Sequence, residues 1–425
     1  MTSPSALAIE PRGTFDAELR VPGSKSITNR ALVIAALADG ESELVDPLMS
    51  DDTQVMLESL GALGCAIEMQ EGAWRVRGRR GHLQRSPAAL RVGNSGTTAR
   101  FLTAAAALAD GPVVIDGSPR MRERPIEDLV RALERLGVRA EVLGQHGCPP
   151  VRVHGGGIRG GRVAIDASGS SQYVSAVLLV APYARSDVVL DFAYGKLVSR
   201  PYVELTLRLM RAFGAECDWT EPFGVRVAAR RTYRGRRYEI EPDASSAVYP
   251  FCAAAIAGGR VRVLGIPPDS VQADLGLLEV LERMGCEVRK GPDWAEVRGP
   301  LGRLRGVDVD MNDMPDAALA LAVVALFANE PSTIRNVANL RIKESDRLKA
   351  LETELRRLGA RAHATRDSLR IEPGRLQGAE IHTYDDHRMA MAFALVGLRV
   401  PGVAIRDPDC VSKTWPGYFS VLEKL

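Results

Sequence analysis

The chain has 425 residues, of which 46% are hydrophobic and 25% charged, and its net charge at pH 7 is +2. This composition is typical of a soluble globular protein with two or three domains, and the near balance of charge argues against a nucleic-acid partner. The six cysteines are scattered without C-x-x-C spacing, which argues against a structural metal and against disulfides and favours a cytoplasmic protein. No segment has the length and apolarity of a membrane span, and the first residues lack the pattern of a signal peptide.

The predicted elements recur six times along the chain, with a period of about 72 residues. Each copy opens with the end of a strand, continues through a polar or glycine-containing turn, and then enters a nearly all-apolar helix. The six copies begin at Val21, Val92, Ile165, Ile240, Val309 and Ile381. A helix that is apolar on every side is expected to be buried, so these six helices are predicted to form the cores.

A second, amphipathic helix follows in each copy, and in five copies it ends at a glycine that can adopt a left-handed conformation. These glycines are Gly64, Gly137, Gly214, Gly285 and Gly359. Strand patterns come next, so the repeated unit is β-α-β-α-β-β, with three units in each domain. We expect an α/β protein whose first domain spans residues 22–239 and whose second combines residues 1–21 with 240–425. The N-terminal segment is expected to supply the strand that the truncated sixth copy lacks.

The polar turns that start the six buried helices are predicted anion sites, because a helix N-terminus carries unsatisfied N–H groups and partial positive charge. Quasi-symmetry places three such ends on one face of each domain, and two facing domains would enclose a cleft. Cations gather in these turns and in the segments before the amphipathic helices. They are Lys25, Arg30, Arg120, Arg122, Arg124, Arg200, Arg341, Lys343, Arg347, Arg388 and Lys413. Each alone is typical of a protein surface, but together they predict a ligand with several phosphate or carboxylate groups.

Nine motifs lie along these turns and segments. They are "VPGSKSITNRAL", "GNSGTTAR", "PRMRERPI", "SGSSQY", "LVSRPY", "MNDMPDAA", "NLRIKESDRL", "YDDHRMAMAFAL" and "SKTWPGY". In order and spacing they resemble the motifs of the 5-enolpyruvylshikimate-3-phosphate synthase family, from about residue 11 to the C-terminus. The resemblance implies two inside-out α/β barrels, each with pseudo-threefold symmetry, which close around their substrates.

The resemblance also implies a reaction that uses no metal or cofactor. The enolpyruvyl group of phosphoenolpyruvate moves to the 5-hydroxyl of shikimate 3-phosphate, and phosphate is released. The route is addition and elimination through a tetrahedral intermediate, in the pathway to chorismate and the aromatic amino acids. Glyphosate is expected to compete with phosphoenolpyruvate, and the protein is expected to be a monomer.

The resemblance assigns roles to individual residues of the motifs. The catalytic candidates are Lys25, Asp316 and Glu344. The residues expected to contact shikimate 3-phosphate are Lys25, Ser26, Arg30, Ser170, Ser171, Gln172, Ser199, Tyr202, Asp316, Asn339 and Lys343. Those expected to contact phosphoenolpyruvate are Lys25, Gly96, Arg124, Gln172, Arg347, Arg388 and Lys413. It remains open whether His387 and Arg100 touch a ligand or serve only the structure.

Structural alternatives exist for three of these residues. Asp316 follows a proline at a helix start, where a carboxylate complements the helix dipole. Glu344 could pair with a neighbouring arginine of "IKESDR", and Ser26 could cap its helix.

Two rival functions share the implied fold. The related transferase that acts on UDP-N-acetylglucosamine carries a reactive cysteine in the segment equivalent to residues 117–125, and this segment has no cysteine here. A non-catalytic anion-binding protein is disfavoured because Lys25, Asp316 and Glu344 are all present.

Overall fold

The computed structural model describes residues 6–425 and contains two compact units. The central unit is formed by Gly23–Ile240, and the terminal unit joins the residues up to Pro22 to Glu241–Leu425. Both crossings lie within one residue of the boundaries expected from the repeats. The first five residues, part of the stretch expected to lack a signal peptide, lie outside the described residues.

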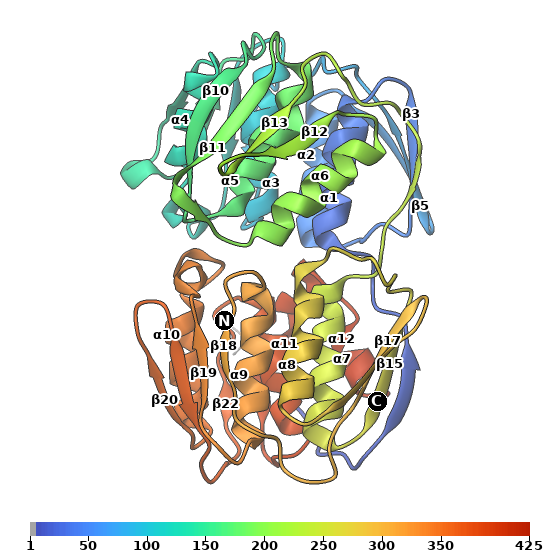
Figure 1. Cartoon of the computed structure of the whole chain (residues 1–425), viewed down its shortest axis with the longest axis vertical. Helices are drawn as coiled ribbons and strands as arrows, with labels where there is room; N and C mark the ends of the chain where they lie inside the picture. Colours follow the sequence, from blue (N-terminus) through green and yellow to red (C-terminus); the bar gives the residue numbers. More distant parts are fainter. Residues whose placement is uncertain (1–5) are drawn as a thin grey trace. The chain divides into compact units, whose positions relative to one another are not determined.

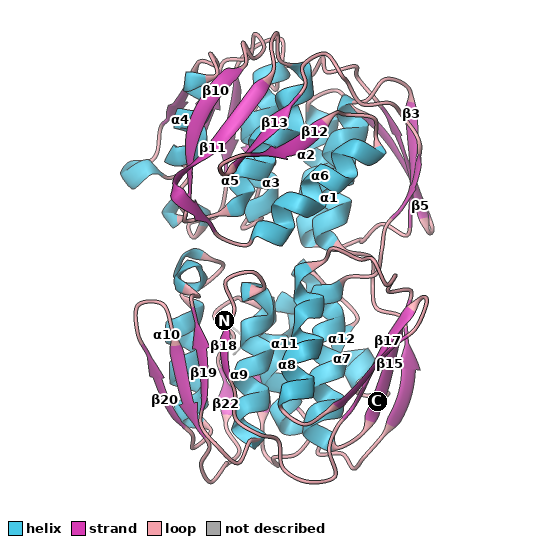
Figure 2. Cartoon of the chain, in the orientation of Figure 1, coloured by secondary structure: helices cyan, strands magenta, loops and turns pink. Residues whose placement is uncertain are grey.

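Three four-stranded sheets flank the helices of the central unit, one for each repeat (Figures 1 and 2). In each of the strand orders below, the first two strands pair in parallel, and the remaining neighbours pair antiparallel. The first sheet has the order β14 (Arg237–Glu239), β3 (Glu41–Val45), β5 (Ala73–Arg77) and β4 (Ala66–Gln70). The second has the order β6 (Leu90–Arg91), β7 (Val113–Asp116), β9 (Val151–Val153) and β8 (Ala140–Val142). The third has the order β10 (Gly161–Ala167), β11 (Val188–Leu197), β13 (Gly224–Val227) and β12 (Cys217–Thr220).

Three inner helices of the central unit pack against one another, and three outer helices each bridge two of them. The inner helices are α1 (Lys25–Leu37), α3 (Gly96–Ala105) and α5 (Ser171–Val180). The outer helices are α2 (Asp51–Ala62), α4 (Glu127–Arg135) and α6 (Arg200–Ala212). The inner helices are buried over nearly their whole length, which confirms the burial predicted from their all-apolar sequences.

The terminal unit repeats this plan with three more sheets. The first has the order β16 (Glu287–Lys290), β17 (Trp294–Arg298), β15 (Arg260–Leu264) and β2 (Asp16–Leu19). The second has the order β18 (Asp308–Asp310), β19 (Ser332–Arg335), β21 (Leu369–Glu372) and β20 (Arg361–Ala364). The third has three strands, β1 (Ala6–Ala8), β23 (Ala404–Arg406) and β22 (Glu380–Ile381). The inner helices are α7 (Ala244–Ala257), α9 (Ala318–Val324) and α11 (His387–Gly397), and the outer helices are α8 (Leu277–Arg283), α10 (Arg347–Arg357) and α12 (Tyr418–Leu422).

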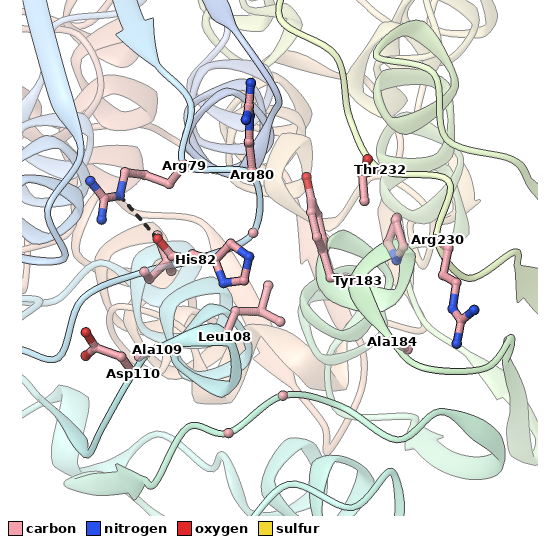
Figure 3. A pocket seen from close by; sticks show the side chains of 15 residues that line it. Arg79, Arg80, His82, Leu108, Ala109, Asp110, Tyr183, Ala184, Arg230 and Thr232 are labelled. Carbon is pink, nitrogen blue, oxygen red and sulfur yellow. Dashed lines mark hydrogen bonds between the residues drawn. The ribbon is translucent and has the colours of Figure 1, made fainter.

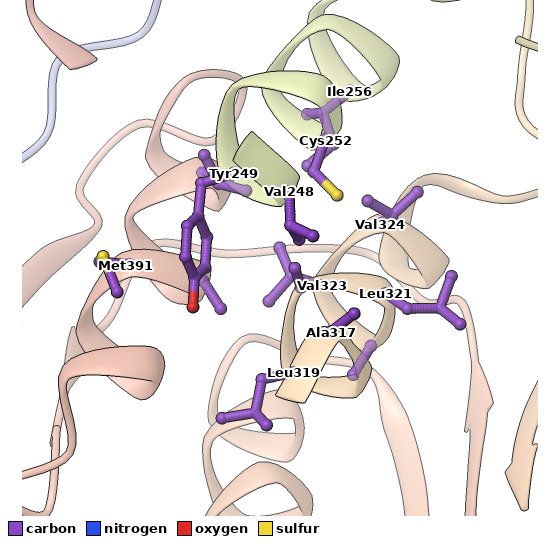
Figure 4. Packing of buried hydrophobic residues seen from close by; sticks show 14 of the residues in the cluster. Val248, Tyr249, Cys252, Ile256, Ala317, Leu319, Leu321, Val323, Val324 and Met391 are labelled. Atoms are coloured by element: carbon purple, nitrogen blue, oxygen red, sulfur yellow. The ribbon is translucent and has the colours of Figure 1, made fainter. Parts of the chain in front are cut away.

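The inner helices of the terminal unit interlock through small and branched side chains (Figure 4). Val248 and Cys252 of α7 are buried beside Val323 of α9, and Met391 of α11 belongs to the same core. Alanine is frequent in all three helices, and its short side chain allows helix backbones to approach closely. The helices therefore form the inside of each unit and the sheets its outside, which is the inside-out arrangement implied by the resemblance.

Two strands pair within one unit although the helix that follows each of them in sequence lies in the other unit. The strand β2 directly precedes α1 in sequence, yet it pairs with β15 of the terminal unit. The strand β14 directly precedes α7, yet it pairs with β3 of the central unit. The other N-terminal strand, β1, pairs antiparallel with β23, which confirms the expectation that the N-terminal segment completes the sixth repeat.

The predicted helix-ending glycines are also confirmed. All five have left-handed φ values, between 86° and 107°. A residue with a Cβ atom is strained in this conformation, so glycine lets the chain turn sharply from each outer helix into the following hairpin.

Candidate active site

The N-terminal ends of the inner helices carry capping side chains. Ser24, Ser95 and Ser170 cap α1, α3 and α5 by accepting a hydrogen bond from a backbone N–H of the first turn. Asp243 and Asp386 do the same for α7 and α11. Ser26 is the second residue of α1, so the alternative that it caps this helix is wrong. Capping satisfies only part of the N–H groups at each end, and the remaining positive potential suits an anion.

Lys25 is the first residue of α1 and is joined to the first outer helix by an ion pair. Its Nζ lies 3.0 Å from Oδ2 of Asp52 in α2, and the side chains of the two residues are 13% and 4% exposed. The pair fixes the ammonium group at the start of α1. Asp52 was not among the residues predicted for the site.

Arg30 lies one turn further along α1 and is almost fully buried. Its Nε donates to Oγ1 of Thr206 in α6 at 2.8 Å, and its Nη2 donates to Oγ of Ser175 in α5 and to the carbonyl of Tyr202, both at 3.3 Å. Burial lowers the pKa of Arg30 to about 10, so the guanidinium is still charged at neutral pH. Among the described residues its hydrogen bonds go to hydroxyl and carbonyl oxygens, which leaves this charge available to an anionic ligand.

Arg124 follows η2 (Met121–Glu123) and packs against the start of α3. Its Nη1 donates to the backbone carbonyl and to Oδ1 of Asn94, at 3.0 and 3.1 Å. A Cβ atom on Gly96 would lie 2.5 Å from Nη2 of Arg124. Glycine is therefore required at this position for the guanidinium to lie where it does.

Arg100 and Tyr173 hold the segment that carries Arg124. Nη2 of Arg100 and Oη of Tyr173 both donate to the carbonyl of Pro125, at 2.8 and 2.6 Å. Arg100 is nearly fully buried, and its contacts favour the structural alternative over direct ligand contact.

The remaining predicted residues of the central unit lie at the starts of α5 and α6. Ser171 and Gln172 open α5, and Gln172 Nε2 donates to Oγ1 of Thr97 in α3 at 3.4 Å. Ser199 precedes α6 in a left-handed conformation, with φ of 53°. Such a backbone is uncommon outside glycine and is often found at functional positions.

In the terminal unit, Arg347 joins three carboxylates. Its Nε lies 2.8 Å from Oδ2 of Asp386, its Nη1 2.9 Å from Oδ1 of Asp316, and its Nη2 2.9 Å from Oε2 of Glu344. The Arg347 side chain is 1% exposed. We call the ion-paired group at these helix ends the terminal cluster. It consists of Asp316, Lys343, Glu344, Arg347, Asp386 and Arg388.

Asp316 lies in η6 (Pro315–Ala317), directly before α9, and is held by three cations. Nη1 of Arg347 and Nη2 of Arg388 lie 2.9 and 3.1 Å from its carboxylate oxygens, and Nζ of Lys343 lies at 3.7 Å. Burial opposes ionisation of this group, but Arg388, Lys343 and Arg347 outweigh it and hold the pKa of Asp316 well below its usual range. The carboxylate is therefore ionised at neutral pH, and its contacts go well beyond the helix dipole.

The other predicted residues of the terminal unit are also largely buried. Nη1 of Arg388 donates to the hydroxyl of Tyr249 at 3.4 Å, and Nδ1 of His387 lies 3.7 Å from Oδ1 of Asp386. Asn339 lies in η8 (Ala338–Ile342) and Lys413 in η9 (Pro408–Lys413), and both are less than one-tenth exposed. Burial of so many polar groups at the starts of inner helices is costly unless they serve a ligand or one another.

Four arginines of the predicted cationic set contact neighbouring side chains of their own surface. Arg120 pairs with Glu123 at 2.8 Å. Arg122 pairs with Asp116, and Arg341 pairs with Asp346. The guanidinium carbon of Arg200 lies 4.4 Å from the ring centroid of Trp219. Such contacts are typical of ordinary structural charges.

The central unit has a hollow of about 490 Å³ at the opposite, C-terminal ends of its inner helices (Figure 3). Arg79, Arg80 and Arg230 line it together with Tyr183, and Arg80 pairs with Asp39 at 2.6 Å. Cations are favourable at helix C-termini because of the helix dipole. The helix ends account for these arginines without a ligand.

Within residues 6–425, no helix has both the length and the apolarity needed to cross a membrane. In the same range, no group of three or more His, Cys, Asp or Glu side chains is arranged to hold a metal ion.

Two comparisons of structure define the class of protein. A solved EPSP synthase from Acinetobacter baumannii matches with a TM-score of 0.81 at 26% identity, covering 99% of this chain and 97% of that one. The enolpyruvyl transferase NikO from Streptomyces tendae matches with a TM-score of 0.79 at 21% identity and the same coverage, which shows a shared fold. The chain therefore has the fold of the enolpyruvyl transferases.

Comparisons of sequence narrow this class to one family. The family model for EPSP synthase (3-phosphoshikimate 1-carboxyvinyltransferase) matches residues 9–422. A 3-phosphoshikimate 1-carboxyvinyltransferase from Nostoc punctiforme is 46% identical over 407 residues, which is 95% of each chain. One from Serratia proteamaculans is 45% identical over 425 residues, covering 99% of this chain and 98% of that one. The chain belongs to the EPSP synthase family, as the nine motifs predicted.

Proposed function

We propose that this chain transfers the enolpyruvyl group of phosphoenolpyruvate to the 5-hydroxyl of shikimate 3-phosphate and releases phosphate. Membership of the EPSP synthase family supports this reaction. The main structural support for this reaction is the terminal cluster, in which an ionised carboxylate and three cations meet at the starts of buried helices. A reaction between two anionic substrates needs cations at the leaving phosphate and a base at the hydroxyl.

The proposed addition step forms one C–O bond and one C–H bond, and breaks the O–H bond of the hydroxyl and the π bond of the phosphoenolpyruvate C=C. The 5-hydroxyl oxygen attacks the second carbon of phosphoenolpyruvate and loses its proton, while the methylene carbon gains a proton. In elimination, the methyl group loses a proton, its C–H electron pair re-forms the C=C bond, and the bond between the second carbon and the phosphate oxygen breaks, so that phosphate leaves. Asp316 is the proposed base of the first step because its carboxylate is ionised at neutral pH, but the same cations that lower its pKa also lower its basicity. Glu344 is the proposed acid, with Lys25 as an alternative proton carrier, and the groups exchange roles in elimination.

The other proposed contacts divide by substrate. Shikimate 3-phosphate is bound by its carboxylate at Ser26 and Arg30, by its phosphate at the serines of α5 and α6, and by its ring hydroxyls in the terminal unit. The other residues proposed to contact shikimate 3-phosphate are Lys25, Ser170, Ser171, Gln172, Ser199, Tyr202, Asp316, Asn339 and Lys343. Phosphoenolpyruvate is bound by Lys25, Gly96, Arg124, Gln172, Arg347, Arg388 and Lys413. We also propose that the protein acts as a monomer in the cytoplasm, where its free cysteines stay reduced.

The test is release of inorganic phosphate from purified protein given both substrates, with no metal and no nucleotide added. We expect turnover only when both substrates are present, and none when UDP-N-acetylglucosamine replaces shikimate 3-phosphate. Asp316→Asn should abolish turnover, because the amide cannot take a proton. Asp313→Asn, an exposed acid three residues away, is the matched control and should keep wild-type activity. Absence of turnover in the wild-type protein would refute the proposal.

A further inference from the structure

Asp274 is a buried carboxyl group to which the proposed reaction assigns no role. It lies in η5 (Ala273–Gly276), directly before α8, and is 2% exposed. Ser245, in the first turn of α7, donates a hydrogen bond from Oγ to Oδ2 of Asp274. The other oxygen, Oδ1, is buried without a hydrogen-bond partner among the described residues. Burial of a charged carboxylate oxygen without a hydrogen-bond donor costs free energy. This cost disfavours the ionised form of Asp274.

The charges around Asp274 connect it to the terminal cluster. Its segment η5 packs against α7, α8 and η6. Asp316 of η6 and Arg388 of α11 act on it electrostatically, as does Asp243, which caps α7. The charged side chains of α8 lie on its exposed side. They are Glu279, Glu282 and Arg283.

These surroundings place the ionisation of Asp274 near neutral pH. Burial raises its pKa to about 6, the negative charge of Asp316 adds to the rise, and Arg388 and the hydrogen bond from Ser245 oppose it. The ordinary pKa of an aspartate is about 3.9. The terminal cluster itself is balanced, with three cations and three carboxylates. An ionised Asp274 adds a further negative charge to the surroundings of Asp316 and Arg388, which contact each other, and so weakens the attraction of Arg388 for an anion.

We propose that Asp274 is a positioning residue, which sets how tightly Arg388 holds the phosphoenolpyruvate anion through the charge on its own carboxyl group. The inference rests on the proposed function, which assigns Arg388 to phosphoenolpyruvate. When Asp274 is neutral, the Arg388 guanidinium interacts with the substrate and with Asp316. When Asp274 is ionised, its negative charge competes with the substrate for the positive charge of Arg388. The KM for phosphoenolpyruvate therefore rises as Asp274 loses its proton, while kcat changes little.

The test compares the KM for phosphoenolpyruvate of wild type and Asp274→Asn from about pH 5 to about pH 8. The amide has nearly the shape of the carboxyl group and stays neutral. Ionisation of the substrate phosphate is common to both proteins, so the ratio of their KM values isolates Asp274. We expect the wild-type KM to equal that of Asp274→Asn at about pH 5 and to exceed it roughly three- to tenfold above about pH 7. Asp269→Asn, at an exposed position of the same connection, should match wild type at every pH.

A ratio that does not change with pH would overturn the proposal, as would the same pH dependence in Asp269→Asn. If Asp274→Asn does not fold, Ser245→Ala provides a second test. This change removes a donor that lowers the pKa of Asp274, so the step in KM should move to higher pH, and an unmoved step would contradict the role. An inactive wild type would refute the proposed function, whereas an active wild type with a flat ratio would refute only the role of Asp274.

Discussion

Lys25 combines a proposed catalytic role with a structural one, because its ammonium group pairs with Asp52. Lys25→Met should lower kcat by roughly two orders of magnitude or more, since a positive charge at the reacting groups is lost. It should also lower the melting temperature by a few degrees, because a nearly buried Asp52 loses its partner. The measurements are steady-state kinetics and a thermal melt.

The control for Lys25 is Asp52→Asn, which breaks the same ion pair and keeps the ammonium group. We expect a comparable fall in melting temperature with a much smaller loss of turnover. Equal losses of turnover in the two variants would mean that Lys25 acts only through the ion pair.

Gly96 bears on the expected inhibition by glyphosate. In Gly96→Ala the methyl group would lie 2.5 Å from Nη2 of Arg124, so the guanidinium must move. We expect a higher KM for phosphoenolpyruvate and weaker competition by glyphosate, with little change in the KM for shikimate 3-phosphate. Gly61→Ala, where nothing lies within 4 Å of the new methyl, should leave all three constants unchanged. An unchanged inhibition constant in Gly96→Ala would contradict this account.

The motifs predicted well which side chains lie at the helix starts. They predicted less well which other side chains these residues contact. Asp386 belongs to the motif "YDDHR", and an aspartate directly before an apolar helix is a capping signal. Its ion pair with Arg347 could not be predicted, because the two residues lie on different helices whose contact depends on packing. The same holds for Asp52, and for Thr206, which holds Arg30.

At the level of elements, Arg347 links the starts of three helices of the terminal unit. It opens α10 and binds Asp316 before α9 and Asp386 before α11. Arg347→Gln should lower the free energy of unfolding by about 3 to 5 kcal/mol, because buried carboxylates lose their cation. Urea unfolding followed by circular dichroism measures this difference.

The control for Arg347 lies on the same helix. Arg356 pairs with Glu352 and its side chain is 54% exposed. Arg356 also donates a hydrogen bond to the carbonyl of Ala362. Arg356→Gln should therefore cost about 1 kcal/mol or less, the usual effect of a surface pair together with one hydrogen bond. If both variants lose the same stability, the link between the three helix starts contributes nothing.

The repeated elements were predictable because the inner helices are apolar on all sides and the outer ones are amphipathic, two patterns that differ strongly. The expected boundaries placed β2 and β14 in the units where they lie, but the partners of these two strands were less accessible. Each is a short strand with no marker of its partner, and only closure of the sheets decides which unit it joins. The sequence of the sixth repeat lacks a segment for one strand, so the need for a strand from elsewhere could be predicted.

At the scale of the molecule, the pairing of β14 with β3 completes the sheets of the central unit with strands of that unit alone. A fragment of residues 23–240 contains every strand of its three sheets and all six of its helices. We expect this fragment to unfold cooperatively in urea when produced alone. A fragment of residues 23–234 lacks β14, leaves the edge of β3 unpaired, and should be less stable and prone to aggregate. A disordered 23–240 fragment would contradict the division into units.

The strands β1 and β2 also dictate an order of events on the ribosome. Ile405 of β23, the partner of Leu7, is translated roughly 400 residues after it. At typical elongation rates this separation corresponds to a delay of roughly 20 to 80 s. The middle of the polypeptide can finish folding during that interval, while the segment made earliest waits without its partner. The terminal unit can therefore complete its folding only near the end of translation, because β1 cannot pair until β23 has been synthesised.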